Sequence, residues 1–187
     1  MTRFLNIEES HPGLVILIVL SLVLFSYLLP GRFFTVTTFS SMAFQLPELG
    51  LLTLAMFIAI LSGGLNLCII ATANLTALYI AWFLISFLPP ESGMAMQLLM
   101  LLAAIAGAVV IAVIIGVITG LMVSKVGAHP ILVTLATMMT VNGIGIWLTR
   151  GAAVSGMPEV VRALGSETFL GVPIPLWLFL VTAALMA

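Results

Sequence analysis

The side chains in this sequence that could do chemistry are mostly neutral amides and hydroxyls set among apolar residues. They gather at two places: Ser62-Gly63-Gly64, followed by Asn66 and Asn74, and a later run that holds Thr134 and Thr137. Amides and hydroxyls donate and accept hydrogen bonds, which suits an uncharged, hydroxyl-rich solute. A path for ions would more often contain carboxylates inside its apolar segments. The chemistry favoured here is contact with a neutral solute.

No catalytic or metal-binding constellation accompanies these groups. The sequence has no Walker-type glycine loop, no zinc spacing and no Ser/His/Asp set. Its single cysteine, Cys68, lies in an apolar run, which predicts a packing residue rather than a reactive thiol. His129 comes directly before Pro130, and we interpret it as an interfacial residue rather than a ligand or proton relay. We therefore expect no enzyme, no cofactor and no metal in this chain.

The composition determines the class of protein that positions these groups. Of 187 residues, 63% are hydrophobic and 6% are charged, and the mean hydropathy is +1.38. A soluble domain is about 25% charged, and one this small cannot bury so much apolar surface. A net charge of -1 gives no basic surface for nucleic acid. The composition excludes a soluble enzyme, a nucleic-acid binder and a disordered chain, and it predicts an integral membrane protein.

Charge-free runs measured against a bilayer predict a polytopic all-α helical bundle. A helical span needs about 20 residues, which gives about five complete spans and a sixth that is incomplete. We expect one transmembrane domain over residues 1–187, taken as the amino-terminal portion of a longer protein, with a polar loop at 150–172. The expected spans are 13–29, 43–61, 65–88, 98–123, 131–149 and 174–187.

Small residues recur every four positions in the fourth expected span, which predicts close helix packing on one stripe. A replacement of Gly116 by Leu is expected to block assembly. The alternative is a stripe that slides against a neighbouring helix during transport. The stripe comprises Ala104, Ala108, Ala112, Gly116 and Gly120.

The polar positions allow two interpretations each. The break at Ser62-Gly63-Gly64 is either an ordinary interhelical turn or irregular backbone that lines a translocation path, since such backbone survives at membrane depth only inside protein or beside water. Thr134 and Thr137 share a helix face from which Asn142 departs. They either bond to neighbouring helices or line the path.

The polar loop contains one expected element. Its stretch from Pro158 to Gly165 has proline at the start and glycine at the end, which predicts a short surface helix. Glu159 and Arg162 are three residues apart and can pair. The loop is either solvated surface or a docking site for a soluble partner through Arg150 and Arg162.

Four stretches of the sequence resemble the ribose/simple-sugar class of bacterial ABC transporter permeases. The fragment SGGLNL at 62–67 is similar to the family signature glycine-glycine-isoleucine-aspartate-leucine-serine. The others are GAHPILVTLATM at 127–138, LTRGAAVSGMPE at 148–159 and FLGVPIPLW at 169–177. Asn66 stands where the family usually has aspartate, Cys68 where it has serine and Ile70 where glycine is frequent.

The resemblance implies a pore-forming subunit of an ATP-driven importer in the bacterial inner membrane, working by alternating access without chemistry of its own. Its implied partners are a cytoplasmic ABC ATPase, a second permease subunit and a periplasmic or lipid-anchored solute-binding protein, besides membrane lipid. Arg150, Glu159 and Arg162 are the candidate contacts to the binding protein.

Three alternatives remain beside the sugar-type importer. Branched-chain amino acid permeases share a motif similar to residues 64–67, and nucleosides are another conceivable cargo. A stand-alone membrane assembly or regulatory subunit is the alternative from a different class. A secondary carrier has little support, because the expected spans contain neither ionisable pairs nor an inverted repeat.

Overall fold

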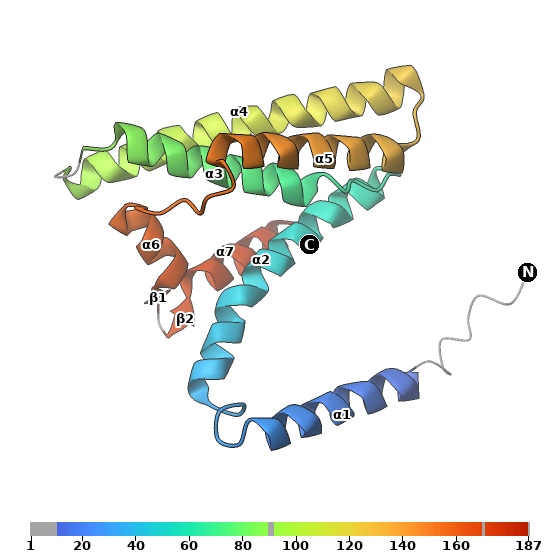
Figure 1. Cartoon of the computed structure of the whole chain (residues 1–187), viewed down its shortest axis with the longest axis vertical. Coiled ribbons are helices and arrows are strands. Elements are labelled where there is room, and N and C mark those ends of the chain that lie inside the picture. The colour runs from blue at the N-terminus through green and yellow to red at the C-terminus, as the bar shows by residue number, and fades with distance from the viewer. Residues whose placement is uncertain (1–10, 90–91, 170, 187) are drawn as a thin grey trace, which may run out of the picture. The chain divides into compact units, whose positions relative to one another are not determined.

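The computed structural model describes residues 11–89, 92–169 and 171–186. The chain divides into two compact units, residues 1–45 and 46–187. Figure 1 shows the elements along the chain. Their order is α1 (His11–Leu28), α2 (Val36–Leu61), α3 (Ile69–Phe87), α4 (Met94–Val126), α5 (Pro130–Thr149), α6 (Glu159–Ser166), β1 (Thr168–Phe169), β2 (Val172–Pro173) and α7 (Ile174–Met186).

The first unit contains α1 and the first turns of α2. The rings of Phe25 and Phe33 stack with centroids 5.9 Å apart across the turn that joins the two helices. Helix α2 begins at Val36, earlier than the expected start near residue 43. The local reason is a hydroxyl cap, because Thr35 Oγ1 accepts the backbone N–H of Thr38 at 3.3 Å, as an N-cap side chain does.

The core of the second unit lies among α3, α4 and α5, which pack against one another (Figure 1). One buried cluster joins Cys68, Ala71 and Val141, and a second joins Leu84, Leu101 and Ala104. The prediction that Cys68 is a packing residue is confirmed, since only 2% of it is exposed.

Close approach of α4 to α3 depends on a small residue at position 107. A Cβ atom at Gly107 would collide with the phenol of Tyr79. Small residues permit such close contact between membrane helices, and this glycine leaves room for the Tyr79 ring at the α3–α4 seam.

The polar segment after α5 holds the expected short helix and one unexpected hairpin. Helix α6 is preceded by Pro158, and Arg162 Nη2 lies 3.7 Å from Glu159 Oε1, so the predicted local pair is confirmed. Strands β1 and β2 pair in antiparallel fashion with Phe169 opposite Val172. The sequence analysis predicted only loop there, because two-residue strands leave no periodic pattern.

Within the described residues, four helices, α2 to α5, are long and apolar enough to cross a membrane, and two further apolar helices, α1 and α7, are shorter. Their surfaces carry exposed large apolar side chains such as Leu99, Val110 and Val117, which suits contact with lipid. The protein is a polytopic helical membrane protein, as predicted. At about 1.5 Å per residue, the 33 residues of α4 exceed the hydrocarbon thickness of about 30 Å.

Candidate functional site

Residues 62–68 separate α2 from α3. Residues 62–66 form one wall of a cavity of about 300 Å³, which we call the break cavity. Gly63 has φ +89°, a conformation that side chains rarely adopt, and this turns the chain out of α2. The structure brings together here five of the predicted pathway residues and two of the predicted stripe. They are Ser62, Gly63, Gly64, Asn66 and Thr134, with Gly116 and Gly120 from α4.

The polar groups of the break cavity are already engaged within the chain. Asn66 Oδ1 accepts the backbone N–H of Cys68 at 3.0 Å, and the Ser62 hydroxyl donates to the carbonyl of Ala59 at 2.8 Å. These contacts shape the break itself. An aspartate at position 66 offers the same acceptor oxygen, so the departure from the family signature preserves this local bond while it removes a charge.

The threonines of α5 likewise join elements of the fold. The Thr134 hydroxyl lies 2.9 Å from the carbonyl oxygen of Pro130 and 3.4 Å from that of Leu65, and it is 4% exposed. The Thr119 and Thr137 hydroxyl oxygens lie 3.5 Å apart between α4 and α5. Thr134 thus connects α5 to the break and Thr137 lies beside α4, and a role of either residue in lining a path stays a prediction.

The small-residue stripe of α4 divides into two parts. Ala104 and Ala108 are buried and Ala112 is half-buried, whereas a Cβ atom added at Gly116 or Gly120 meets nothing within 4 Å. A four-residue step overshoots a full helical turn by about 40°, so five such positions drift across the helix. Packing of the two glycines against another helix stays a prediction.

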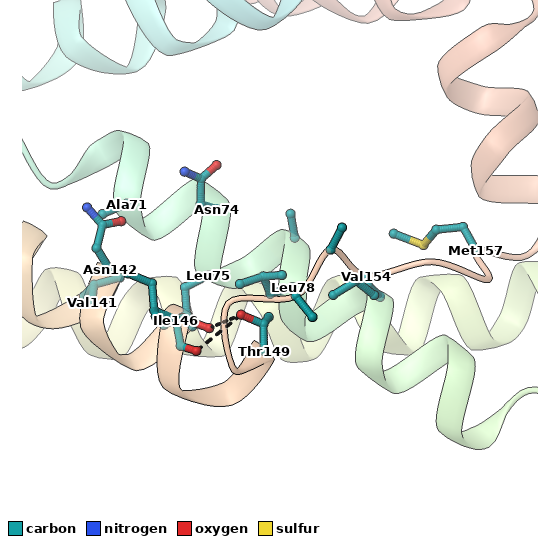
Figure 2. Close-up of a pocket in the computed structure, with 15 residues that line it drawn as sticks. Ala71, Asn74, Leu75, Leu78, Val141, Asn142, Ile146, Thr149, Val154 and Met157 are labelled. Atoms are coloured by element: carbon teal, nitrogen blue, oxygen red, sulfur yellow. Dashed lines mark hydrogen bonds between the residues drawn. The ribbon is translucent and has the colours of Figure 1, made fainter.

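A larger cavity of about 620 Å³ lies along α3, α5 and the irregular segment 152–157; we call it the amide groove. Asn74 from α3 and Asn142 from α5 both line it, and their amides project to the same side of the helix pair (Figure 2). Asn74 was a predicted pathway residue. The sequence analysis set Asn142 aside because it departs from the face of Thr134 and Thr137.

The two amides of the groove are not engaged. Neither side chain makes a hydrogen bond within the part of the chain that the structure describes, and both are exposed. Thr149, at the end of the groove, is instead bonded to its own helix, 3.0 Å from the carbonyl oxygen of Gly145 and 3.4 Å from that of Ile146 (Figure 2). The described residues that line the groove include no ionisable side chain.

The three candidate contact residues of the loop, Arg150, Glu159 and Arg162, line neither the break cavity nor the amide groove. Arg150 ends α5 in the left-handed conformation, φ 52°, with an exposed side chain. Glu159 borders a separate small cavity beside Gln97 and Pro158, and its partner Arg162 is exposed. Contact of these three residues with a binding protein stays a prediction.

Comparison with known proteins finds relatives among bacterial import permeases. The chain is 28% identical over 177 residues, 90% of its length, to the autoinducer 2 import system permease protein LsrD of Enterobacter sp. (strain 638). It is 25% identical over 143 residues, 73% of its length, to the protein of the same name from Yersinia enterocolitica (serotype O:8 / biotype 1B). The chain is a distant homologue of these permeases. The resemblance to sugar-type ABC importer permeases noted above is thereby confirmed.

This permease homologue spans 50% and 40% of the lengths of those two relatives. No family model matches the chain, and no solved structure matches it. The matched relatives are permease proteins, a type of subunit that is typically non-catalytic.

Proposed function

We propose that this chain forms part of the membrane-spanning permease subunit of an ATP-driven, binding-protein-dependent importer. The observation that carries the proposal is the similarity to import permeases along 90% of the chain. The proposed cargo is a sugar or a similar hydroxyl-rich small solute. The relatives are named for autoinducer 2, a sugar-like solute, which makes it the first cargo to test.

The proposed mechanism places no chemistry in this chain. A cytoplasmic ATPase hydrolyses ATP, a binding protein outside the bacterial inner membrane delivers the solute, and a second permease subunit completes the pathway. The helices then alternate between access to one side and to the other. The four long apolar helices of the structure and the uncharged lining of the amide groove support this role.

The test is uptake by cells that carry this gene, compared with a deletion strain and with the deletion strain complemented by the intact reading frame. We expect the deletion to abolish ATP-dependent uptake of one labelled hydroxyl-rich solute, with autoinducer 2 and ribose as the first probes, and complementation to restore it. Unchanged uptake of both probes, together with lost uptake of leucine, would contradict a sugar-like cargo and favour a branched-chain amino acid permease.

A stand-alone assembly or regulatory subunit makes a different prediction in the same strains. Its deletion would leave uptake of all three probes intact while another membrane complex fails to assemble. Blue-native electrophoresis of the membranes reports that outcome, which would overturn the proposed function.

A further inference from the structure

We propose that the amide groove is where this chain hydrogen-bonds its solute, and that Asn74 and Asn142 are the two contacts. The solute is an uncharged molecule of sugar size that carries hydroxyl groups. This inference rests on the proposed function and assigns its substrate contacts to a groove rather than to the glycine-rich break.

The depth of the two amides is the first observation. At about 1.5 Å per residue, Asn74 lies about 8 Å inside the start of α3 and Asn142 about 10 Å inside the end of α5. Both helices have the length and composition of membrane spans. An amide that faces hydrocarbon without a partner is costly.

The lack of internal partners is the second observation. No hydrogen bond within the described ranges 11–89, 92–169 and 171–186 uses either amide, although both line one cavity. They project to the same side of the α3–α5 pair (Figure 2). Two unengaged amides on one side, contributed by two different spans, indicate that this side faces water or a polar solute rather than lipid.

The shape and chemistry of the groove define its occupant. Its volume of about 620 Å³ falls in the range of about 300–1,000 Å³ typical of small-molecule sites. Each amide can both donate and accept, which matches hydroxyl groups. Leu75, Leu78 and Ile146 add apolar lining, against which the apolar face of a sugar ring can lie. A charged solute would find no countercharge among the lining residues and would lose its hydration unpaired.

Cysteine labelling of the whole chain in native membranes tests the site directly. The chain has one cysteine, so Cys68→Ser gives a background without thiols. Single cysteines are introduced into this background at the two groove positions, as Asn74→Cys and Asn142→Cys. The matched controls lie outside the groove lining: Ala73→Cys on α3 and Thr140→Cys on α5. The probe is an uncharged, hydrophilic methanethiosulfonate reagent, which needs no countercharge in the groove.

We expect the thiols at 74 and 142 to react about tenfold faster than those at 73 and 140, because a thiol reacts as its thiolate and that form needs a hydrated site. We also expect excess ribose to slow the reaction at 74 and 142 only. Equal slow reaction at all four positions would overturn the inference, because lipid or another helix would then cover the groove. Fast reaction at 74 and 142 that ribose leaves unchanged would also overturn it, since the groove would be wet without binding this class of solute.

The background is checked in parallel. Cys68 is buried, so it should react little with the probe and can also be left in place. The four cysteine variants are therefore made with Cys68 retained as well. The ratio of the labelling rates at 74 and 142 to those at 73 and 140 must be the same in both backgrounds. Failure of the groove and failure of the proposed function remain distinguishable. If the deletion strain loses uptake but the thiols at 74 and 142 react slowly, the assignment of the groove is contradicted and the importer function stands. Protected labelling with unchanged uptake contradicts the importer function and leaves a solute-binding groove.

Discussion

The two cavities of the second unit differ in what their polar groups are doing. At the break cavity, Asn66 and Thr134 are bonded to backbone atoms of the chain itself. At the amide groove, Asn74 and Asn142 are bonded to nothing in the described chain. A polar group that has an internal partner stabilises the fold, whereas one without a partner in a membrane helix needs water or a ligand. Substitutions that remove a bonded polar group at the break should therefore lower stability, and substitutions of the two amides of the groove should change solute uptake.

The largest expected effect concerns the α3–α4 seam. Gly107→Leu would drive a side chain into Tyr79 and should cost about 3 kcal/mol through overpacking. The measurement is thermal unfolding of the detergent-solubilised chain followed by fluorescence size exclusion. Gly116→Leu is the matched control, because the space beside Gly116 at the break cavity is open, and its melting temperature should stay near that of the wild type.

Equal destabilisation by the two leucine variants would show that the break cavity is filled. Gly116→Leu also tests whether the stripe meets a second subunit. Its expected signature is normal folding of the chain with loss of cross-linking between permease subunits. Normal cross-linking would contradict that contact.

The next effect belongs to the break cavity. Thr134→Val keeps the side-chain shape but removes a buried hydroxyl that bridges α5 and the Leu65 carbonyl, and leaving such a carbonyl unpaired should cost about 2 kcal/mol. Thr140→Val on the same helix is the control, because that residue is exposed and, among the described residues, its hydroxyl bonds only to the Ala136 carbonyl of its own helix. Unfolding of both variants at the same temperature would contradict the tethering role of Thr134.

A smaller effect is expected at Asn66. Asn66→Ala removes the acceptor for the Cys68 N–H and should cost about 1 kcal/mol, as the loss of a helix cap does. Asn66→Asp keeps the acceptor and should unfold near the wild-type temperature with an unchanged choice of sugar. A shift of uptake from one sugar to another in Asn66→Asp would show that charge at this position selects the solute.

The smallest effect on stability is expected at the groove. Asn142→Ala and Asn74→Ala remove exposed, unbonded amides, so each should change the free energy of unfolding by less than about 0.5 kcal/mol. Thermal unfolding is again the measurement. If either variant loses as much unfolding free energy as Thr134→Val, the amides support the fold. The proposed difference between the two cavities would then be wrong.

Hydropathy alone predicts most of the helices of this fold, but it predicts only some of the residues that line the two cavities. Apolar runs predicted the membrane helices, and the pattern from Pro158 to Gly165 predicted the helix α6. The early start of α2 was missed because the Thr35 cap precedes a polar stretch. The break extends through Cys68 because an asparagine turn follows the glycines.

Asn142 was missed for a different reason. Within α5 it lies off the threonine face, and only the packing of α3 on α5 places it beside the cavity that Asn74 lines. One available signal was that each of two spans carries an isolated asparagine. For the small-residue stripe of α4, the helical repeat of 3.6 residues per turn already implies that positions four apart rotate around the helix. Which of those positions are buried depends on where α3 crosses α4, and the sequence does not give that.

The most direct test of the contrast is the initial rate of solute uptake per folded protein in the complemented deletion strain. Two variants are compared: the double variant Asn74→Ala/Asn142→Ala, called the double amide variant, and the single variant Thr134→Val. Each rate is normalised to the amount of folded chain measured in the membrane. We expect the initial uptake rate of the double amide variant to fall by about tenfold or more, since each lost hydrogen bond is worth about 1 kcal/mol. Thr134→Val should retain the wild-type rate per folded chain. Full uptake by the double amide variant, with loss confined to Thr134→Val, would contradict the account.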